Sequence, residues 1–323
     1  MNEAQVAFQT VVDALLDEGK TFPRHHLYQF SDIEPSQLET LLNIWPRLTS
    51  TRKQALLANL DDLAVEDTLL CFDDLGRSLL VDPDPQVRIL AMHLLSECED
   101  VKLVPAFLDI LGHDEDAAVR AAAATTLGLF VELGELEEIS VRTRRQVEDA
   151  LLGLVNGDDR PVVRLRALES LGYSSRPEIP VLLESAYARE DPDWVASALF
   201  AMGRSIDDRW QEQVIHMLFS ENQCVRVAAV QAAGELALAS ARPLLLSMLD
   251  GEEDDDVFSA AIWSLSQIGG EDVRTYLENL LDRVGDDDEQ AGFIEAALEN
   301  LAFTEDLNRF ELMAFDAEDK PSD

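Results

Sequence analysis

The sequence predicts an all-α fold, a solenoid of about eight stacked helix pairs. Its 323 residues repeat one pattern: an apolar residue, an anchor that is usually arginine, then alanine, leucine and a small residue at offsets three, seven and eight. Prolines keep a fixed register with these anchors, and no alternating strand pattern of useful length is present. A helix pair of roughly 31 residues cannot bury its own apolar face. Neighbouring pairs must therefore stack, which predicts one continuous superhelical domain.

The clearest copies of the repeat are anchored at Arg120, Arg164 and Arg226. Apolar residues just before the anchor, and three, four and seven positions after it, form a stripe with the helical period of 3.6, which predicts a buried helix face. Most steps between anchors are 31 to 36 residues, but the step from 120 to 164 is about 12 residues too long. The eight anchor positions are 52, 88, 120, 164, 195, 226, 258 and 294.

Each repeat is predicted to hold two helices. Pro105, Pro180 and Pro243 each lie 15 residues before an anchor, and proline is tolerated in the first turn of a helix because its missing N–H has no partner there. A first helix therefore begins near the proline, and a second helix carries the anchor. Acid-rich turns precede the second helices, where carboxylates can cap free N–H groups. These turns are Asp114-Glu115-Asp116, Asp158-Asp159, Asp191-Pro192-Asp193 and Asp254-Asp255-Asp256.

Residues 1–50 do not repeat cleanly and are predicted to form a helical cap over the first repeat. Ser36 followed by Glu39 has the pattern of a capping box. The repeats span 51–303, and residues 304–323 are predicted to be an acidic tail, disordered over 316–323. An amphipathic helix near the N-terminus is indicated by Val6, Phe8, Val11, Val12, Leu15 and Leu16.

The long step between anchors predicts an insertion at 129–146. Insertions in solenoids usually form loops, often on a binding face. Residues 142–166 carry six arginines and four acids, in a chain of net charge −39. Two interpretations stand: a contact for an anionic group of a partner, or a solvated loop whose arginines neutralise nearby acids.

The repeated pattern with its acid-rich turn resembles HEAT repeats over roughly residues 50–302, and the short spacing resembles the bacterial type found in phycobilin lyases. The resemblance implies a right-handed solenoid. In HEAT proteins the anchor arginine commonly bonds to the acidic turn and forms a ladder along the stack. Carried over, this implies structural roles for Arg88, Arg120, Arg164 and Arg226. The anchors Val195, Phe258 and Ile294 depart from the pattern, so the ladder is expected to break there.

Second helices usually line the concave face of HEAT folds, so their outward positions are candidates for binding. Helical angle places offsets five and nine after the anchor away from the core. Aromatic residues and arginine are the usual anchors of interfaces. An alternative is that superhelical curvature packs these aromatics against neighbouring helices. The predicted partner-binding residues are Tyr173, Phe200, Trp263, Arg166, Arg204 and Gln231.

The net charge of −39 repels phosphate backbones and anionic membrane surfaces, which argues against nucleic-acid and membrane partners. It allows a basic partner, although solubility or a high-salt habitat explains the same charge. Three cysteines without a C-x-x-C pair fit a reducing compartment. No signal peptide is visible, and the apolar stretch Ala121–Val131 is short for a membrane span. A cytoplasmic location is therefore expected.

No catalytic, cofactor or metal site is predicted. The five histidines form no H-x-x-x-H pair, and none is followed by glutamate, as the di-iron HEAT hydroxylases require. Gly19-Lys20-Thr21 lacks the preceding glycine and the strand of a phosphate-binding loop. The predicted function is a non-catalytic interaction scaffold that binds a protein partner, with a basic peptide or helix as the favoured type. The alternative, implied by the resemblance, is a bilin chromophore lyase or chromophore chaperone.

Overall fold

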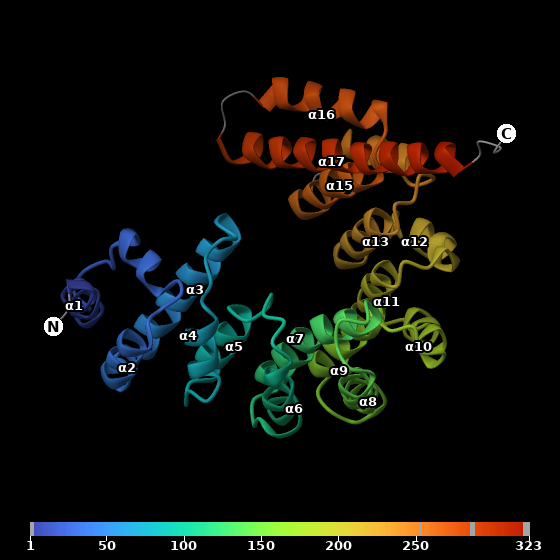
Figure 1. The fold of residues 1–323 in the computed structure, drawn as a ribbon. Coiled ribbons are helices and arrows are strands. Elements are labelled where there is room, and N and C mark those ends of the chain that lie inside the picture. Colours follow the sequence, from blue (N-terminus) through green and yellow to red (C-terminus); the bar gives the residue numbers. More distant parts are fainter. Residues whose placement is uncertain (1–2, 252–253, 285–287, 319–323) are drawn as a thin grey trace. The chain divides into compact units, whose positions relative to one another are not determined.

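The computed structural model describes residues 3–251, 254–284 and 288–318, in which helices and turns occur and no strand does (Figure 1). The chain divides into two compact units, 1–171 and 172–323. In each unit, helices pair and the pairs stack, which confirms the predicted all-α solenoid of helix pairs. Every predicted anchor lies on the second helix of a pair or, for Arg52, on the first long helix after the cap.

The N-terminal unit begins with the predicted cap and continues into the repeats. Within it, α4 packs on α5, α6 on α7 and α8 on α9, while the anchor-bearing helices α3, α5, α7 and α9 pack in succession. Its α-helices are α1 (Glu3–Leu16), α2 (Pro35–Ile44), α3 (Ser50–Glu66), α4 (Asp73–Leu79), α5 (Pro85–His93), α6 (Val104–His113), α7 (Ala117–Glu135), α8 (Val141–Asn156) and α9 (Pro161–Ser170).

The C-terminal unit contains four more pairs, each of a first helix and a second helix. The second helices α11, α13, α15 and α17 pack in succession, as in the N-terminal unit. Its α-helices are α10 (Glu178–Tyr187), α11 (Pro192–Arg204), α12 (Gln211–Met217), α13 (Gln223–Glu235), α14 (Arg242–Leu249), α15 (Asp255–Ile268), α16 (Glu271–Val284) and α17 (Asp288–Glu318).

The helix starts follow the predicted chemistry. Pro105 and Pro243 lie at the first or second position of α6 and α14. Asp116, Asp191 and Asp254 cap α7, α11 and α15 by accepting hydrogen bonds from backbone N–H groups in the first turn. The prediction is confirmed at these helices. It is wrong for Asp158-Asp159, because the N-cap of α9 is Arg160 without a side-chain hydrogen bond, and the Asp159 carboxylate binds Arg120 instead.

The glycine eight positions after several anchors permits close approach of the next second helix. A Cβ atom at Gly128 would lie 2.9 Å from Ser170 Oγ, and one at Gly203 would lie 2.9 Å from Ala232 Cα. The Ser170 hydroxyl also donates to the carbonyl of Ala124, at 2.9 Å, across the same contact. Glycine is therefore needed for packing at these positions rather than for backbone conformation.

Three local predictions are wrong. The predicted insertion loop at 129–146 is instead the extended end of α7, a short turn and the start of α8, because Phe130, Val131 and Leu133 continue the buried face of α7. The capping box of α2 is formed by Glu34 and Gln37, not by Ser36, because Pro35 occupies the first helical turn. Helix α17 continues to Glu318, so it includes most of the predicted acidic tail, and residues 319–323 lie outside the described residues.

Helix α7 includes the apolar stretch predicted over Ala121–Val131. By length and composition alone, its 19 residues are enough to cross a membrane, so the prediction of a stretch too short to do so is wrong. The core helix of a packed repeat passes the same test, and 61% of its most apolar window is buried inside the structure. The Phe130 ring lies 6.2 Å from that of Phe107 on α6. Helix α7 is therefore a packed helix of the stack.

Candidate functional site

Two of the anchor arginines connect successive repeats of the N-terminal unit. Arg88 Nε and Nη2 donate to the two carboxylate oxygens of Asp114, each at 2.8 Å. Arg120 does the same for Asp159, with Nε 2.9 Å from Oδ2. Each arginine also donates through Nη1 to a carbonyl of its own preceding turn, at Asp82 for Arg88 and at Asp114 for Arg120. The paired hydrogen bonds from Arg120 hold the pKa of Asp159 below its ordinary value.

The other two anchor arginines bind backbone carbonyl groups. Arg164 donates to the carbonyl of Val155 from Nε and Nη2, at 3.2 and 2.9 Å. Arg226 donates through Nη1 to the carbonyls of Ser220 and Glu221, at 3.0 and 3.2 Å. All four arginines thus bind the turn or helix end before their own helix, and Arg88 and Arg120 also bind a carboxylate of the next repeat.

Three of the predicted partner-binding residues lie together in the C-terminal unit. The Arg204 guanidinium lies 4.8 Å from the centroid of the Tyr173 ring and 4.2 Å from that of Phe200. Both rings are half-buried, so the prediction that they face solvent is wrong. The reason is local: Arg204 lies four residues after Phe200 on α11, on the same helix face, and a guanidinium is attracted to the faces of aromatic rings. The aromatic pair fixes a cation in place.

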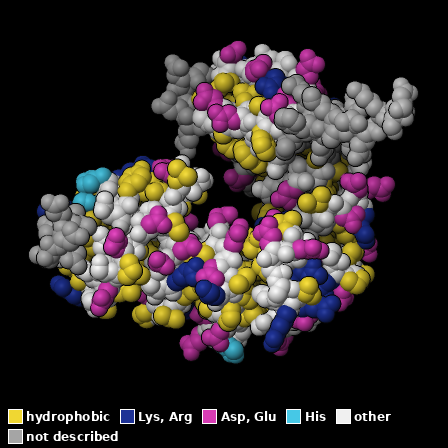
Figure 2. All heavy atoms as spheres, in the orientation of Figure 1, with side chains coloured by type: hydrophobic (Ala, Val, Ile, Leu, Met, Phe, Trp, Pro, Cys, Tyr) yellow, Lys and Arg dark blue, Asp and Glu magenta, His cyan; other side chains and the backbone are white. Residues whose placement is uncertain are grey.

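Trp263 and Gln231 are exposed, as predicted. They lie five residues after their anchors on α15 and α13, and Phe200 has the same position on α11. Packed helices are about 8–10 Å apart, so these three side chains form a row of roughly 20 Å across the second helices. Trp263 is 41% exposed. The face of this unit seen in Figure 2 carries hydrophobic side chains between acidic ones.

Glu235 lies next to this row and was not predicted as a site residue. It lies nine positions after the anchor on α13, as Arg204 does on α11. A Cβ at Gly203 would lie 2.5 Å from its Oε2 atom, and this oxygen has no hydrogen-bond partner among the described residues. Burial raises the pKa of Glu235, and the charge of Arg204 opposes that rise. The position of Glu235 on α13 could be predicted from the sequence. Its burial could not, because burial depends on how closely α11 and α13 pack.

We name these six residues the second-helix surface: Tyr173, Phe200, Arg204, Gln231, Glu235 and Trp263. Phe303 on α17 has the same offset from its anchor as Glu235 and is 63% exposed. Arg166, the remaining predicted residue, lies on α9 in the N-terminal unit, where it is exposed and pairs with Glu169. In the described part of the chain, no group of three or more His, Cys, Asp or Glu side chains is arranged to hold a metal ion.

Comparison with known proteins finds the HEAT-repeat family model matching residues 73–141 and 211–301. No curated protein matches the chain. Among solved structures, the complex of CpcE and CpcF of phycocyanin lyase from Nostoc sp. PCC7120 is 18% identical, covers 71% of this chain and 94% of that chain, and has a TM-score of 0.45. YibA of E. coli is 19% identical, with 75% and 96% coverage and a TM-score of 0.33. An engineered protein is 16% identical, with 93% and 92% coverage and a TM-score of 0.38.

Proposed function

Because this chain is a HEAT-repeat protein, we propose that it is a non-catalytic scaffold that binds a protein partner through the second-helix surface of its C-terminal unit. The single observation that carries the proposal is the exposed Trp263 in line with a preformed Arg204 cluster. Tryptophan side chains are highly buried on average, and tryptophan, tyrosine and arginine dominate the binding energy of interfaces.

The Arg204 cluster supports the proposal through preorganisation. A free arginine side chain loses rotamer entropy when a partner fixes it, at a cost of roughly 0.5–1.5 kcal/mol. Arg204 is already stacked on Tyr173 and Phe200, so most of this cost has been met during folding. The stacked guanidinium therefore has a fixed position on α11 before any partner binds.

A basic segment is the partner type that the charge favours. The chain carries 64 acidic and 25 basic residues, and such a field raises the association rate of a positively charged partner. A basic helix or peptide lying across α11, α13 and α15 would contact the exposed indole of Trp263.

Affinity capture with matched variants tests this proposal. Wild-type chain, Trp263→Ala and Phe219→Ala are immobilised at equal density, and proteins retained from native lysate are quantified by mass spectrometry. Phe219 is the control, because it is 66% exposed in the same unit but follows α12 and is not on a second helix. We expect a protein retained by wild type and by Phe219→Ala to lose at least about tenfold in affinity for Trp263→Ala, as for an interface hot spot.

Equal retention by all three proteins, with unchanged thermal unfolding, would exclude the second-helix surface as the binding site. Retention lost equally in Phe219→Ala and Trp263→Ala would indicate nonspecific apolar adsorption and would also reject the proposal. Arg204→Ala provides a second measurement, since it removes the preformed cation and leaves Trp263 in place.

A further inference from the structure

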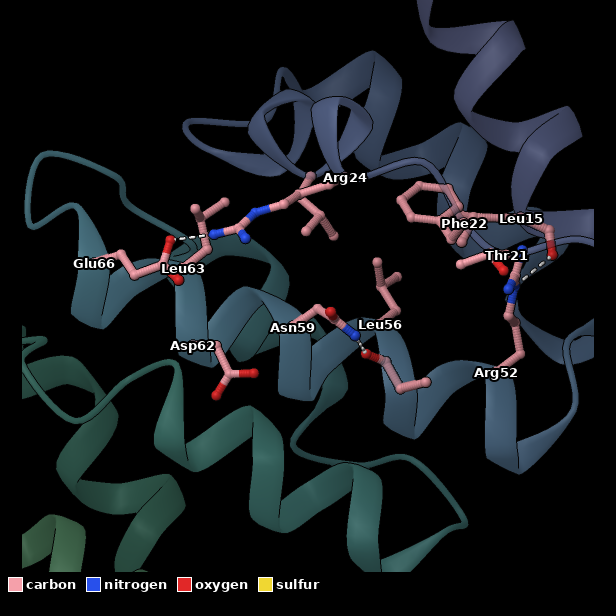
Figure 3. Close-up of a pocket in the computed structure, with 12 residues that line it drawn as sticks. Leu15, Thr21, Phe22, Arg24, Arg52, Leu56, Asn59, Asp62, Leu63 and Glu66 are labelled. Atoms are coloured by element: carbon pink, nitrogen blue, oxygen red, sulfur yellow. Dashed lines mark hydrogen bonds and ion pairs between the residues drawn. The ribbon is translucent and has the colours of Figure 1, made fainter. Parts of the chain in front are cut away.

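A pocket of about 370 Å³ opens in the N-terminal unit between α3 and the segment that follows α1 (Figure 3). Its volume lies in the range of ligand-binding sites. Leu15 contributes from the end of α1, Phe22 and Leu27 from the connecting segment, and Leu56 and Leu63 from α3. Four of these five side chains are buried, and Phe22 is half-buried. The floor of the pocket is therefore apolar and preformed.

The two cations at the pocket already have partners. Arg52 donates to the carbonyls of Ala14 and Leu15 at the end of α1, at 2.8 and 3.3 Å, and its guanidinium lies 5.5 Å from the centroid of the Phe22 ring. Arg24 is bonded to Glu66. A guanidinium has five N–H groups, so Arg52 keeps donors for a carbonyl group while its position stays fixed.

At the end of the pocket away from Arg52, the polar groups that lack a hydrogen-bond partner among the described residues are acceptors. Asp62 lines the pocket and makes no hydrogen bond or ion pair with any described residue. Asn59, one turn earlier on α3, uses its amide N–H on the carbonyl of Ala55, which leaves its side-chain oxygen to accept. Figure 3 shows both side chains on the α3 side of the opening. A cation is the group that satisfies this end.

The pocket has the length of a short extended chain. Arg52 and Asp62 are ten residues apart on α3, and a helix rises 1.5 Å per residue, so they are roughly 15 Å apart along the helix. At about 3.3 Å per residue, the length suits four to five residues.

We propose that this pocket binds an extended peptide segment of a partner protein, about four residues long, with a basic side chain on Asp62. Its apolar side chains lie on Leu56 and Leu63, and a backbone carbonyl at the other end accepts from Arg52. The charge of the chain and the free carboxylate select a basic segment over an acidic one. This site lies within the N-terminal unit, so it stands or fails independently of the second-helix surface.

Fluorescence anisotropy with the full chain tests the proposal. The probe is a fluorescein-labelled tetrapeptide pool with arginine first and an equal mixture of leucine, valine and alanine at the other three positions. The chain's negative charge attracts any cation, so the measurement is made at about 0.3 M salt, where long-range attraction is screened. We expect saturable binding to the wild type, and at least tenfold weaker binding when glutamate replaces arginine in the pool.

Two variants and one control localise the binding. Asp62→Asn removes the carboxylate and should weaken binding about fivefold, the upper effect of an exposed ion pair. Ala55→Trp places a large ring at an exposed position that lines the pocket and should reduce binding more than tenfold. Asp109→Asn, on the exposed face of α6, makes the same charge change away from the pocket and should leave binding unchanged.

Several results would overturn the proposal: no saturable binding, equal binding of the glutamate pool, equal weakening by Asp109→Asn, or full binding by Ala55→Trp. Circular dichroism and thermal unfolding of each variant establish that the fold is retained. Loss of binding in Asp62→Asn and Ala55→Trp while partner capture by the second-helix surface persists would separate the two sites.

Discussion

Lys53 Nζ lies 3.1 Å from Asp82 Oδ2, with both side chains less than a tenth exposed. The same carboxylate oxygen accepts from Trp45 Nε1 at 2.7 Å, and the other accepts from the backbone N–H of Asp84 at 2.9 Å. Trp45 belongs to the cap, Lys53 to α3 and Asp82 to the turn between α4 and α5, so the Asp82 carboxylate joins the cap to the first repeats. It was not predicted from the sequence, because lysine and aspartate are usually solvated.

Removing the carboxylate should be costly. Asp82→Ala leaves Lys53 and Trp45 Nε1 without their acceptor, and losing one partner of a buried ion pair typically costs about 3–5 kcal/mol in the free energy of unfolding. Urea unfolding measures this loss. The double variant Lys53→Met/Asp82→Leu should be destabilised by less than Asp82→Ala, because it buries no unpaired charge. A loss below about 0.5 kcal/mol in Asp82→Ala would show that the pair is not important for stability.

The bonds between Arg120 and Asp159 predict a pH-dependent contribution to stability. Asp159→Asn should lower the free energy of unfolding by about 2 kcal/mol near pH 7, the scale of hydrogen bonds to charged groups. The pKa of Asp159 is lowered in the folded state from an ordinary value of 3.8. A lowered pKa gives stability that is present above pH 3.8 and is lost as the pH falls through the folded-state pKa.

The difference in stability between wild type and Asp159→Asn should therefore shrink below about pH 4. Asp158→Asn is the matched control, because Asp158 precedes Asp159 and its side chain is exposed. This substitution should change the free energy of unfolding by less than about 0.5 kcal/mol. A difference that stays constant down to pH 2 would indicate that the charge of Asp159 does not contribute.

Glu235 predicts the opposite pH dependence. Burial raises its pKa above the ordinary value of 4.5, so the folded chain binds a proton more tightly than the unfolded chain does. The contribution of Glu235 to stability is then greatest below pH 4.5 and falls as the pH rises through the folded-state pKa. Glu235→Gln should raise the free energy of unfolding by about 1 kcal/mol at pH 7 and by little at pH 4.

Thermal unfolding across pH 4–8 measures the effect of Glu235→Gln. The exposed Glu212 on α12 provides the control, and Glu212→Gln should follow the wild-type curve. If Glu235→Gln were less stable than wild type at pH 7, the ionised carboxylate would have a stabilising partner and the interpretation of burial would be wrong.

Two glycines should respond oppositely to the same substitution. A Cβ at Gly203 meets Glu235 Oε2 at 2.5 Å and Ala232 Cα at 2.9 Å, so Gly203→Ala must move α13 and should cost about 1–3 kcal/mol. Gly153 lies inside α8 with no atom within 4 Å of such a Cβ. Gly153→Ala should therefore gain about 0.5–1 kcal/mol from helix propensity. Equal effects in urea unfolding would reject the close approach of α11 and α13.

The fold was predictable where the repeat is local. The anchor spacing, the prolines and the caps at Asp116 and Asp254 all act within one helix or turn, so the sequence contains the whole cause. The extra residues at 129–146 were harder, because a longer period does not distinguish a loop from two lengthened helices. Phe130 and Leu133 favour a lengthened helix because they are buried, and their burial is known only from the structure.

The candidate site was predictable in position but not in environment. Helical angle placed Trp263 outward correctly, since its side chain is exposed on α15. The same angle placed Tyr173 and Phe200 outward, and there it was wrong, because Arg204 covers both rings. Helical angle accounts for residues on one helix, whereas the burial of Glu235 depends on the neighbouring helix.

The serine contacts between second helices have a consequence for how such a chain can change in length. Ser264 on α15 donates to the carbonyl of Val230 on α13 at 2.8 Å, as Ser170 on α9 does to Ala124 on α7. Each contact needs only a serine hydroxyl on one second helix and a backbone carbonyl oxygen on the second helix before it. A duplicated or deleted repeat that keeps the register meets an equivalent neighbour on both sides. Gene duplication can thus lengthen the surface by one helix spacing, about 10 Å, without redesigning the layers next to it.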